Sequence, residues 1–210
     1  SLEISGPTAM WTRPDTGDTP VSYPAPTCGA VKAIFECILL SDWAEVAPTK
    51  VEICKPIVYH CYSTNYGGPL RDQSKEGSYR LLATVLVDVC YRLYAKLMPI
   101  PENYALRGER EMKRQHTGTT NGPHAYTERF ERRLEKGQVY SMPCLGWKEF
   151  TPFYVGPLRP ETDVCEDINI VIPSMLRTCF PHGRQTKPDP MFYTLEKPAE
   201  IRKGVLSYVE

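Results

Sequence analysis

Twenty prolines and fourteen glycines are spread along the 210 residues of this chain. Because both residue types interrupt regular elements, such a chain folds into many short strands, short helices and structured loops rather than long helices. The length suits one large domain or two small ones with a real core. Hydrophobic residues make up 41% of the sequence, which excludes a disordered chain.

The formal charges balance, with 25 Lys and Arg against 25 Asp and Glu. This balance excludes a uniformly basic polyanion binder but leaves room for a local basic cleft. No apolar run approaches the ~20 residues that a membrane helix needs. The first residues also lack the basic and then apolar run of a signal peptide. We therefore expect a cytoplasmic protein with no membrane partner.

The eight cysteines form no C-x-x-C pair. Most of them lie in apolar runs, so we interpret them as reduced structural thiols. Cys54, His60 and Cys61 are close enough in sequence to suggest a metal, but no fourth ligand is evident. We predict no metal site and no cofactor.

The order of the expected elements begins with a strand at residues 2–5. Thr27 is typical of an N-cap, and apolar residues follow at helical spacing until about Ser41. The segment 51–62 is rich in β-forming residues, and the segment 79–97 alternates as a long strand does.

The second half begins with a polar stretch at 98–123, which we interpret as a loop. Good helix formers then fill residues 126–136, and Gly137 is a natural stop for that helix. Strand-like segments complete the chain at 139–156, 168–176 and 191–196. The resulting βαββαβ order predicts an α+β fold of the ferredoxin-like type that RNA-recognition modules share.

The second expected helix lies in a locally basic region. Residues 107–136 carry eight Lys and Arg against five Asp and Glu. Aromatic residues are interleaved nearby at Tyr126, Phe130, Tyr140 and Trp147. Cations that contact phosphates and rings that stack on bases are typical of a nucleic-acid surface. The alternative is a solvated helix face held by its own ion pairs.

Two longer segments resemble a known family. The first is GPTAMWTRP followed by SYPAPTCGAVKAIFECIL, and the second is FERRLEKGQVYSMPCLGWKEF. Both resemble the Cas-five subunit of type I-C CRISPR effector complexes, whose second motif is F-x-R-R-x-x-x-G-Q-x-F-x-x-P-x-L-G-x-R-E-F. The order of the segments, their spacing and the total length also fit.

The resemblance implies an N-terminal ferredoxin-like, RRM-like domain with a β-hairpin insertion and a small C-terminal antiparallel β-sheet region. We place these domains at residues 1–155 and 156–210, with residues 65–78 near the hairpin. Such subunits cap the 5′ handle of the CRISPR RNA (crRNA) in the Cascade complex of antiviral defence. They contact the large subunit and a Cas-seven backbone subunit, and the complex in turn binds target DNA. In type I-C systems they also cut precursor crRNA within each repeat, without a metal.

The usual catalytic set of the family is not matched here. Metal-independent RNA cleavage needs a base for the 2′-OH, a cation for the phosphorane and an acid for the 5′-oxygen. The resemblance places Ala125 and Tyr126 where a Lys-His pair is expected, and Leu39 where a tyrosine is expected. His124 and Tyr126 are the nearest candidates for catalysis, although the ordinary pKa of tyrosine, about 10, suits a base poorly.

Residues that would bind RNA are predicted on the first loop, the two helices and the segments beside them. They are Trp11, Arg13, Tyr23, Lys32, Lys113, Arg114, Arg132, Arg133, Lys136, Trp147 and Lys148. Core packing is the alternative for the aromatic residues, and structural salt bridges or solvation for the cations. Three functions remain open: a non-catalytic crRNA scaffold, the same scaffold with endoribonuclease activity, and an unrelated ferredoxin-like interaction domain.

Overall fold

The computed structural model describes residues 1–40, 44–65, 80–98, 122–177 and 198–208. In these ranges the chain forms a mostly antiparallel sheet with two helices, which confirms an α+β fold. The elements are β1 (Leu2–Ala9), α1 (Cys28–Ile38), β2 (Glu45–Ile53), β3 (Tyr59–Asn65), β4 (Arg80–Met98), α3 (Gly122–Glu135), β5 (Tyr154–Gly156), β6 (Ile170–Ile172), β7 (Ala199–Arg202) and β8 (Val205–Ser207).

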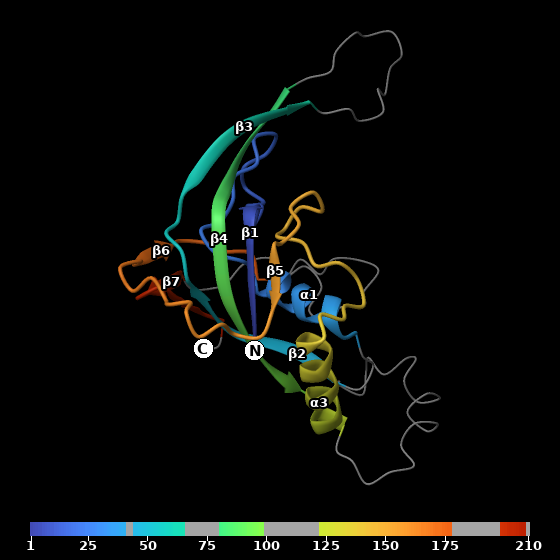
Figure 1. Ribbon diagram of the computed structural model, residues 1–210. Coiled ribbons are helices and arrows are strands. Elements are labelled where there is room, and N and C mark those ends of the chain that lie inside the picture. Colours follow the sequence, from blue (N-terminus) through green and yellow to red (C-terminus); the bar gives the residue numbers. More distant parts are fainter. Residues whose placement is uncertain (41–43, 66–79, 99–121, 178–197, 209–210) are drawn as a thin grey trace, which may run out of the picture.

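The sheet is organised around β4, the long strand that the alternating pattern predicts. Its strands lie in the order β5-β1-β4-β2-β8-β7-β6, and each neighbouring pair is antiparallel. One edge of β4 pairs with β1, while β2 and β3 lie end to end along the other edge. The β3–β4 ribbon therefore extends beyond the rest of the sheet (Figure 1).

The segment 51–62, expected as one β-rich run, is divided between β2 and β3. Pro56 stands in the gap, and a proline has no N–H with which to continue a ladder. Opposite this gap Asp88 adopts a φ of 52°, and its carboxylate lies 2.5 Å from Lys55 Nζ. The edge of β4 is thus interrupted at one place, where two different strands meet it.

Helix α1 begins as predicted. The Thr27 side chain accepts a hydrogen bond from Ala30 N at 3.2 Å, which satisfies one free N–H of the first turn. The helix ends at Ile38 because Leu39 is already extended, with φ of −143°. Its apolar face packs on the sheet, and the Phe35 ring stacks on Phe130 of α3 with centroids 5.4 Å apart. Both helices lie on the same side of β4 (Figure 1).

Helix α3 begins four residues before the predicted start and ends where the glycine predicts. Gly137 has a φ of 63°, a backbone conformation that a glycine adopts without strain. Its N–H donates to Leu134 O, and Gln138 N donates to Arg133 O. These two bonds form a Schellman motif, which satisfies the last carbonyl groups of the helix.

The strand-like segment 139–156 is a strand only at β5, so that prediction was wrong for residues 139–153. Its central glycine, Gly146, has a φ of 94°, and a Cβ built there would lie 1.8 Å from Met10 O. Met10 N in turn donates to Leu145 O at 2.8 Å. The segment therefore forms an irregular loop that contacts the end of β1 through its backbone, because a proline-rich and glycine-containing run cannot continue a ladder.

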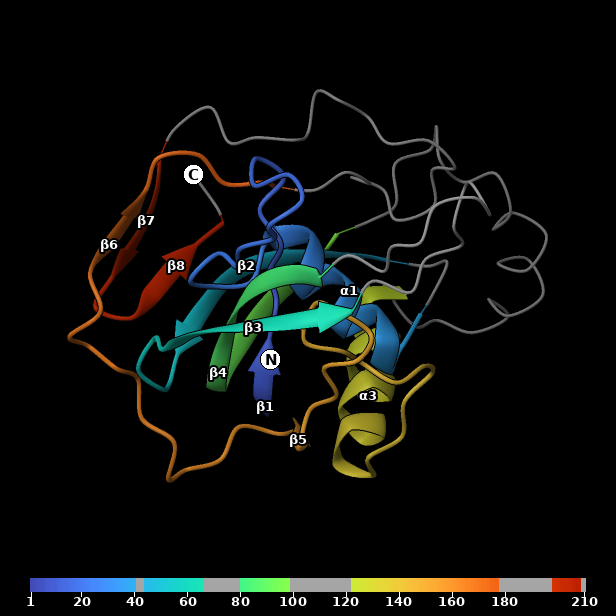
Figure 2. The same cartoon turned by 90° about the horizontal axis from the view of Figure 1, so that it is seen from above.

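The C-terminal strands β6, β7 and β8 form a small antiparallel group that joins the main sheet through β8 and β2. Figure 2 shows this group on the side of the molecule away from α3. Ile201 and Leu206 from these strands belong to the same apolar core as Val51. The division at residues 155 and 156 stays a prediction. The strand-like run 191–196 lies outside the described residues, as does most of the expected loop 98–123.

Among the described residues, no helix is both long and apolar enough to cross a membrane.

Candidate RNA-binding interface

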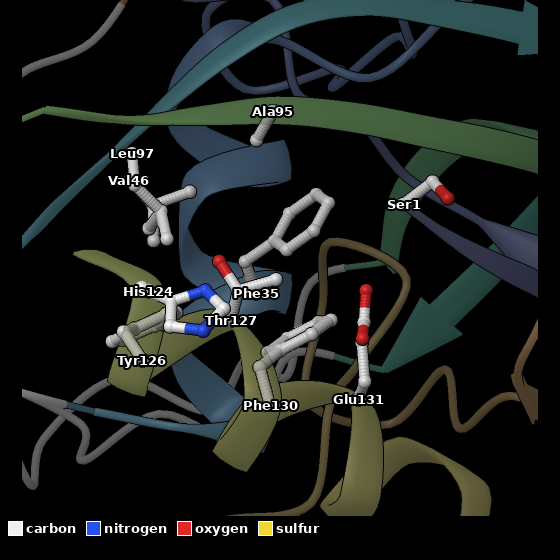
Figure 3. Close-up of a pocket in the computed structure, with 10 residues that line it drawn as sticks. All are labelled: Ser1, Phe35, Val46, Ala95, Leu97, His124, Tyr126, Thr127, Phe130 and Glu131. Atoms are coloured by element: carbon white, nitrogen blue, oxygen red, sulfur yellow. The ribbon is translucent and has the colours of Figure 1, made fainter. Parts of the chain in front are cut away.

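A pocket of about 280 Å³ lies between α3, α1, the start of β2 and the end of β4. The rings of Phe35, Tyr126 and Phe130 and the side chains of His124 and Glu131 are among those that line it (Figure 3). The pocket therefore brings both predicted catalytic residues, His124 and Tyr126, to one place. Their environments differ, and that difference decides what each can do.

Tyr126 is turned into the core. Its hydroxyl donates a hydrogen bond of 2.7 Å to Leu39 O, at the C-terminal end of α1. Its ring stacks with that of Phe130, with centroids 6.2 Å apart, and only 3% of the residue is exposed. Burial raises the pKa of Tyr126 further above its ordinary value, and the nearby charge of Glu36 acts in the same direction. The Tyr126 hydroxyl is therefore engaged in a structural hydrogen bond and is harder to deprotonate than an ordinary tyrosine. Neither property suits a general base.

His124 lies on the exposed side of α3, with 66% of its side chain accessible. Its Nε2 is 3.2 Å from Glu128 Oε1, one helical turn further on. A carboxylate at this distance can hold the direction of the imidazole ring. His124 is thus accessible to a ligand, but a phosphate that approaches it also meets an acidic neighbour.

The exposed surface of α3 is divided by charge. Because residues three, four and seven apart share a face of a helix, Arg129, Arg132 and Lys136 form one stripe, which we call the basic stripe. All three residues are exposed, and none of them forms an ion pair within the part of the chain that the structure describes. Beside it runs an acidic stripe formed by Glu128, Glu131 and Glu135, with His124 at its start.

Arg129 was not among the RNA-binding residues predicted from the sequence. Its spacing from Arg132 and Lys136, three and seven residues, was the signal that would have found it. Arg133, which was predicted, points elsewhere. Its Nε donates to Ile38 O at 2.8 Å, so the guanidinium caps the C-terminal end of α1. Tyr126 and Arg133 together hold the end of one helix from the side of the other.

Three further predicted contacts are buried. Trp11 Nε1 donates to the Tyr91 hydroxyl at 3.2 Å, and the Tyr23 hydroxyl accepts a hydrogen bond of 3.1 Å from Leu176 N. Lys32 is 7% exposed, and its Nζ lies 2.5 Å from Glu45 Oε1. These three residues pack in the core or pair inside it, and their contact with RNA stays a prediction.

The remaining predicted residues lie on loops. Arg13 is half-buried and forms two hydrogen bonds with the Asp15 carboxylate, of 3.1 and 2.7 Å. Trp147 is also half-buried, stacks on Phe150 and donates from Nε1 to Thr12 Oγ1 at 3.0 Å. Lys148 is exposed. Lys113 and Arg114 lie outside the described residues.

Among the residues that the structure describes, no group of three or more His, Cys, Asp or Glu side chains is arranged to hold a metal ion. His60 and Cys61 are neighbours on β3 and are both exposed. Successive side chains of a strand point to opposite faces, so these two do not converge on one ion.

Taken together, the observations define an α+β protein with an antiparallel sheet and a cationic stripe on one helix. The sequence model for the Cas5d form of CRISPR-associated protein Cas5 matches residues 1–192. The chain therefore belongs to the Cas5d family of CRISPR-associated proteins, which confirms the resemblance found in its motifs.

Two relatives carry the name CRISPR pre-crRNA endoribonuclease Cas5d. That of Mannheimia succiniciproducens is 26% identical over 230 residues, covering 98% of this chain and 92% of the relative. That of Thermus thermophilus is 24% identical over 160 residues, which is 74% of this chain and 63% of the relative. The match thus spans less than two thirds of the Thermus protein.

A solved crystal structure of a CRISPR-associated protein has the same fold, with a TM-score of 0.67 at 18% identity. The match covers 100% of this chain and 90% of that one.

Proposed function

We propose that this protein is the crRNA-binding subunit of a type I-C CRISPR effector, the Cascade complex, in antiviral defence. In this role it binds and caps the 5′ handle of the crRNA and contacts the large subunit and a Cas-seven backbone subunit. Membership of the Cas5d family supports the assignment. The observation that carries the RNA contact is the basic stripe of α3, Arg129, Arg132 and Lys136.

We also infer that β1, α1, β2, β4, α3 and β5 form a ferredoxin-like unit. The βαββαβ order with an antiparallel sheet arranged as β5-β1-β4-β2 supports this inference. In that reading β3 and the first half of β4 are the hairpin insertion, and β6, β7 and β8 are the small C-terminal region. Such a unit leaves the outer faces of its helices and its hairpin for partners.

The basic stripe suits a phosphate backbone for three reasons. Its cations are exposed, they are not neutralised by ion pairs among the described residues, and they are spread over ~10 Å of helix axis. Contacts with phosphates require charge and reach but no fixed base sequence. Arg13, by contrast, already shares its guanidinium with Asp15, so its contribution to RNA affinity is expected to be smaller.

The test compares two triple variants of the full chain on the same helix. Replacing Arg129, Arg132 and Lys136 with Ala is expected to weaken binding of a 5′-handle repeat RNA at least tenfold. It should also reduce the slope of log affinity against log salt by about 2, because about 0.7 of a counterion is released per phosphate contact of a single strand. The matched control replaces Glu128, Glu131 and Glu135 with Gln, and should leave affinity unchanged or raise it.

An unchanged affinity and slope in the arginine and lysine variant would show that the RNA lies elsewhere. Equal losses in both variants would mean that the helix itself was disturbed. Circular dichroism of each variant separates that outcome from a real loss of contacts.

The second candidate function is metal-independent cleavage of precursor crRNA, and the names of the two relatives favour it. In this chain the base would be His124, oriented by Glu128. Because Glu128 faces Nε2, the proton of the 2′-OH would be taken by Nδ1. Cations of the basic stripe, with Lys113 and Arg114 of the preceding segment, would stabilise the phosphorane charge, and a water molecule would protonate the leaving 5′-oxygen.

Incubation of the protein with end-labelled repeat RNA in EDTA tests this candidate. A single cut that is lost in His124→Ala and retained in Tyr126→Phe would establish the His124 site. A cut that survives in His124→Ala would place the chemistry on other residues. Binding without a cut would leave the non-catalytic scaffold.

A further inference from the structure

A pair of thiols lies on the face of the sheet opposite the helices. Cys54, directly after β2, lies opposite Cys90 of β4, because the register that pairs Ile53 with Tyr91 continues by one residue. Cys54 N donates to Cys90 O at 2.9 Å. Opposed residues of an antiparallel pair have Cα atoms ~4.5–5.5 Å apart, and their side chains leave the sheet on the same side.

Both thiols are free, and the backbone bond between the two residues places them on neighbouring strands at the same level of the sheet. Cys54 is half-buried and Cys90 is 2% exposed, so small molecules reach the pair from the Cys54 side. The neighbouring Cys54 thiol lowers the pKa of Cys90, while burial and the Glu3 carboxylate act in the opposite direction. The Cys90 thiol and burial raise the pKa of Cys54. The pair therefore combines a buried thiol and a more accessible one on opposed residues of two strands.

Polar groups fix this arrangement. Cys90 Sγ lies 3.6 Å from Glu3 Oε1, and Cys54 Sγ lies 3.7 Å from Glu52 O. Cys165 is also near, since its N–H donates to Ile53 O at 2.9 Å. The face thus contains a dithiol held between two strands, and a third cysteine that serves as an internal comparison.

We propose that Cys54 and Cys90 form a reversible disulfide with low-molecular-weight disulfides as the oxidant. One protein sulfur displaces a thiolate from the oxidant and forms a mixed disulfide. The other then attacks that protein sulfur and displaces the second thiol. In sum, two protein thiols and one oxidant disulfide give the Cys54–Cys90 disulfide and two small thiols. The Cα separation typical of opposed strand residues lies within the 4.4–6.8 Å range of disulfides.

The bond would close a loop that contains β3 and the first half of β4. This loop is anchored at the interruption of β4, where Asp88 has its positive φ and pairs with Lys55. Oxidation would therefore fix the root of the β3–β4 ribbon, and reduction would release it. The proposal does not depend on the RNA function of α3, which lies on the other side of the sheet.

The test treats the folded, full-length protein with oxidised glutathione and then with dithiothreitol. We expect the loss of two titratable thiols, one cross-linked peptide pair containing Cys54 and Cys90, and a rise in Tm of about 5–10 °C that the reductant reverses. Cys54→Ser should abolish the cross-link and the Tm shift, whereas Cys165→Ser should retain both.

Three outcomes would overturn the proposal. They are a glutathione adduct on Cys54 without a cross-link, a cross-link that joins other cysteines, and a Tm shift that persists in Cys54→Ser. Since Cys54 is half-buried and its side chain bonds only to Glu52 O among the described residues, its serine variant is expected to fold.

Discussion

On the side of the sheet that carries α1 and α3, the strands present Leu2, Ile4 and Leu93 to a continuous apolar core. On the other side, the residues between them are Glu3 and Arg92. Glu3 is fully buried, yet it accepts hydrogen bonds from Arg159 N at 3.0 Å and Nε at 2.6 Å, and from Thr162 Oγ1 at 3.0 Å. The face that carries the helices is thus packed with aromatic and aliphatic side chains, whereas the opposite face buries a carboxylate whose hydrogen bonds are satisfied.

The difference teaches where this fold tolerates change. An apolar core loses stability in proportion to the volume that is removed, and neighbouring groups relax only in part. A buried carboxylate loses its role as soon as one partner changes, because the remaining charges are left without a counterpart. The apolar face is therefore expected to contribute more to the free energy of unfolding. The contribution of the polar face is expected to depend more strongly on side-chain charge and on pH.

The largest effect is expected on the apolar face. Phe130→Ala removes a ring that stacks on Phe35 and lines the pocket between the helices. The free energy of unfolding should fall by about 3–5 kcal/mol, which is usual for a buried Phe→Ala change. Urea denaturation measures it. A loss below 1 kcal/mol would mean that α3 is not held by this contact, and would reverse the ranking of the two faces.

A smaller loss is expected from Glu3→Gln on the polar face. The amide keeps the shape but leaves Arg159 and Arg92 without the negative charge between them. Because both arginine side chains are partly exposed, at 36% and 18%, water compensates for part of the change. We expect about 2–3 kcal/mol by the same urea measurement. A Glu131→Gln variant on the exposed side of α3 serves as the control and should be neutral.

The pH dependence of stability sharpens the comparison. Burial alone would raise the pKa of Glu3, but hydrogen bonds from the Arg159 N–H, its guanidinium and Thr162 outweigh it and lower the pKa. A carboxylate whose folded pKa is depressed contributes its stability above its unfolded pKa, about 4.3, and loses it as pH falls through the folded value. Wild type should therefore lose more stability than Glu3→Gln between pH 5 and pH 3. Parallel curves would contradict this role of Glu3.

The smallest effect concerns the polar group that reaches into the apolar face. Tyr126→Phe keeps the ring in place but leaves Leu39 O without the hydroxyl. The expected loss is about 1 kcal/mol, as for a typical buried hydrogen bond. A loss of RNA cleavage with unchanged stability would instead assign the hydroxyl to catalysis.

Local patterns in the sequence determined several elements directly. Alternation along 79–97 predicted β4, Thr27 predicted the start of α1, and Gly137 predicted the end of α3. Each depends on residues within one or two turns of the element, so neighbours in sequence suffice. The two family motifs likewise identified the Cas5d family before any contact was known.

Only the tertiary structure decided what the candidate residues do. Tyr126, Arg133 and Lys32 carry the same side chains whether they face RNA or the protein, and their direction follows from where α1 lies against α3 and β2. Glu3 meets Arg159 across 156 positions of sequence, and Cys54 meets Cys90 only because two strands share one register. Such contacts arise from long-range packing, which local sequence patterns do not encode.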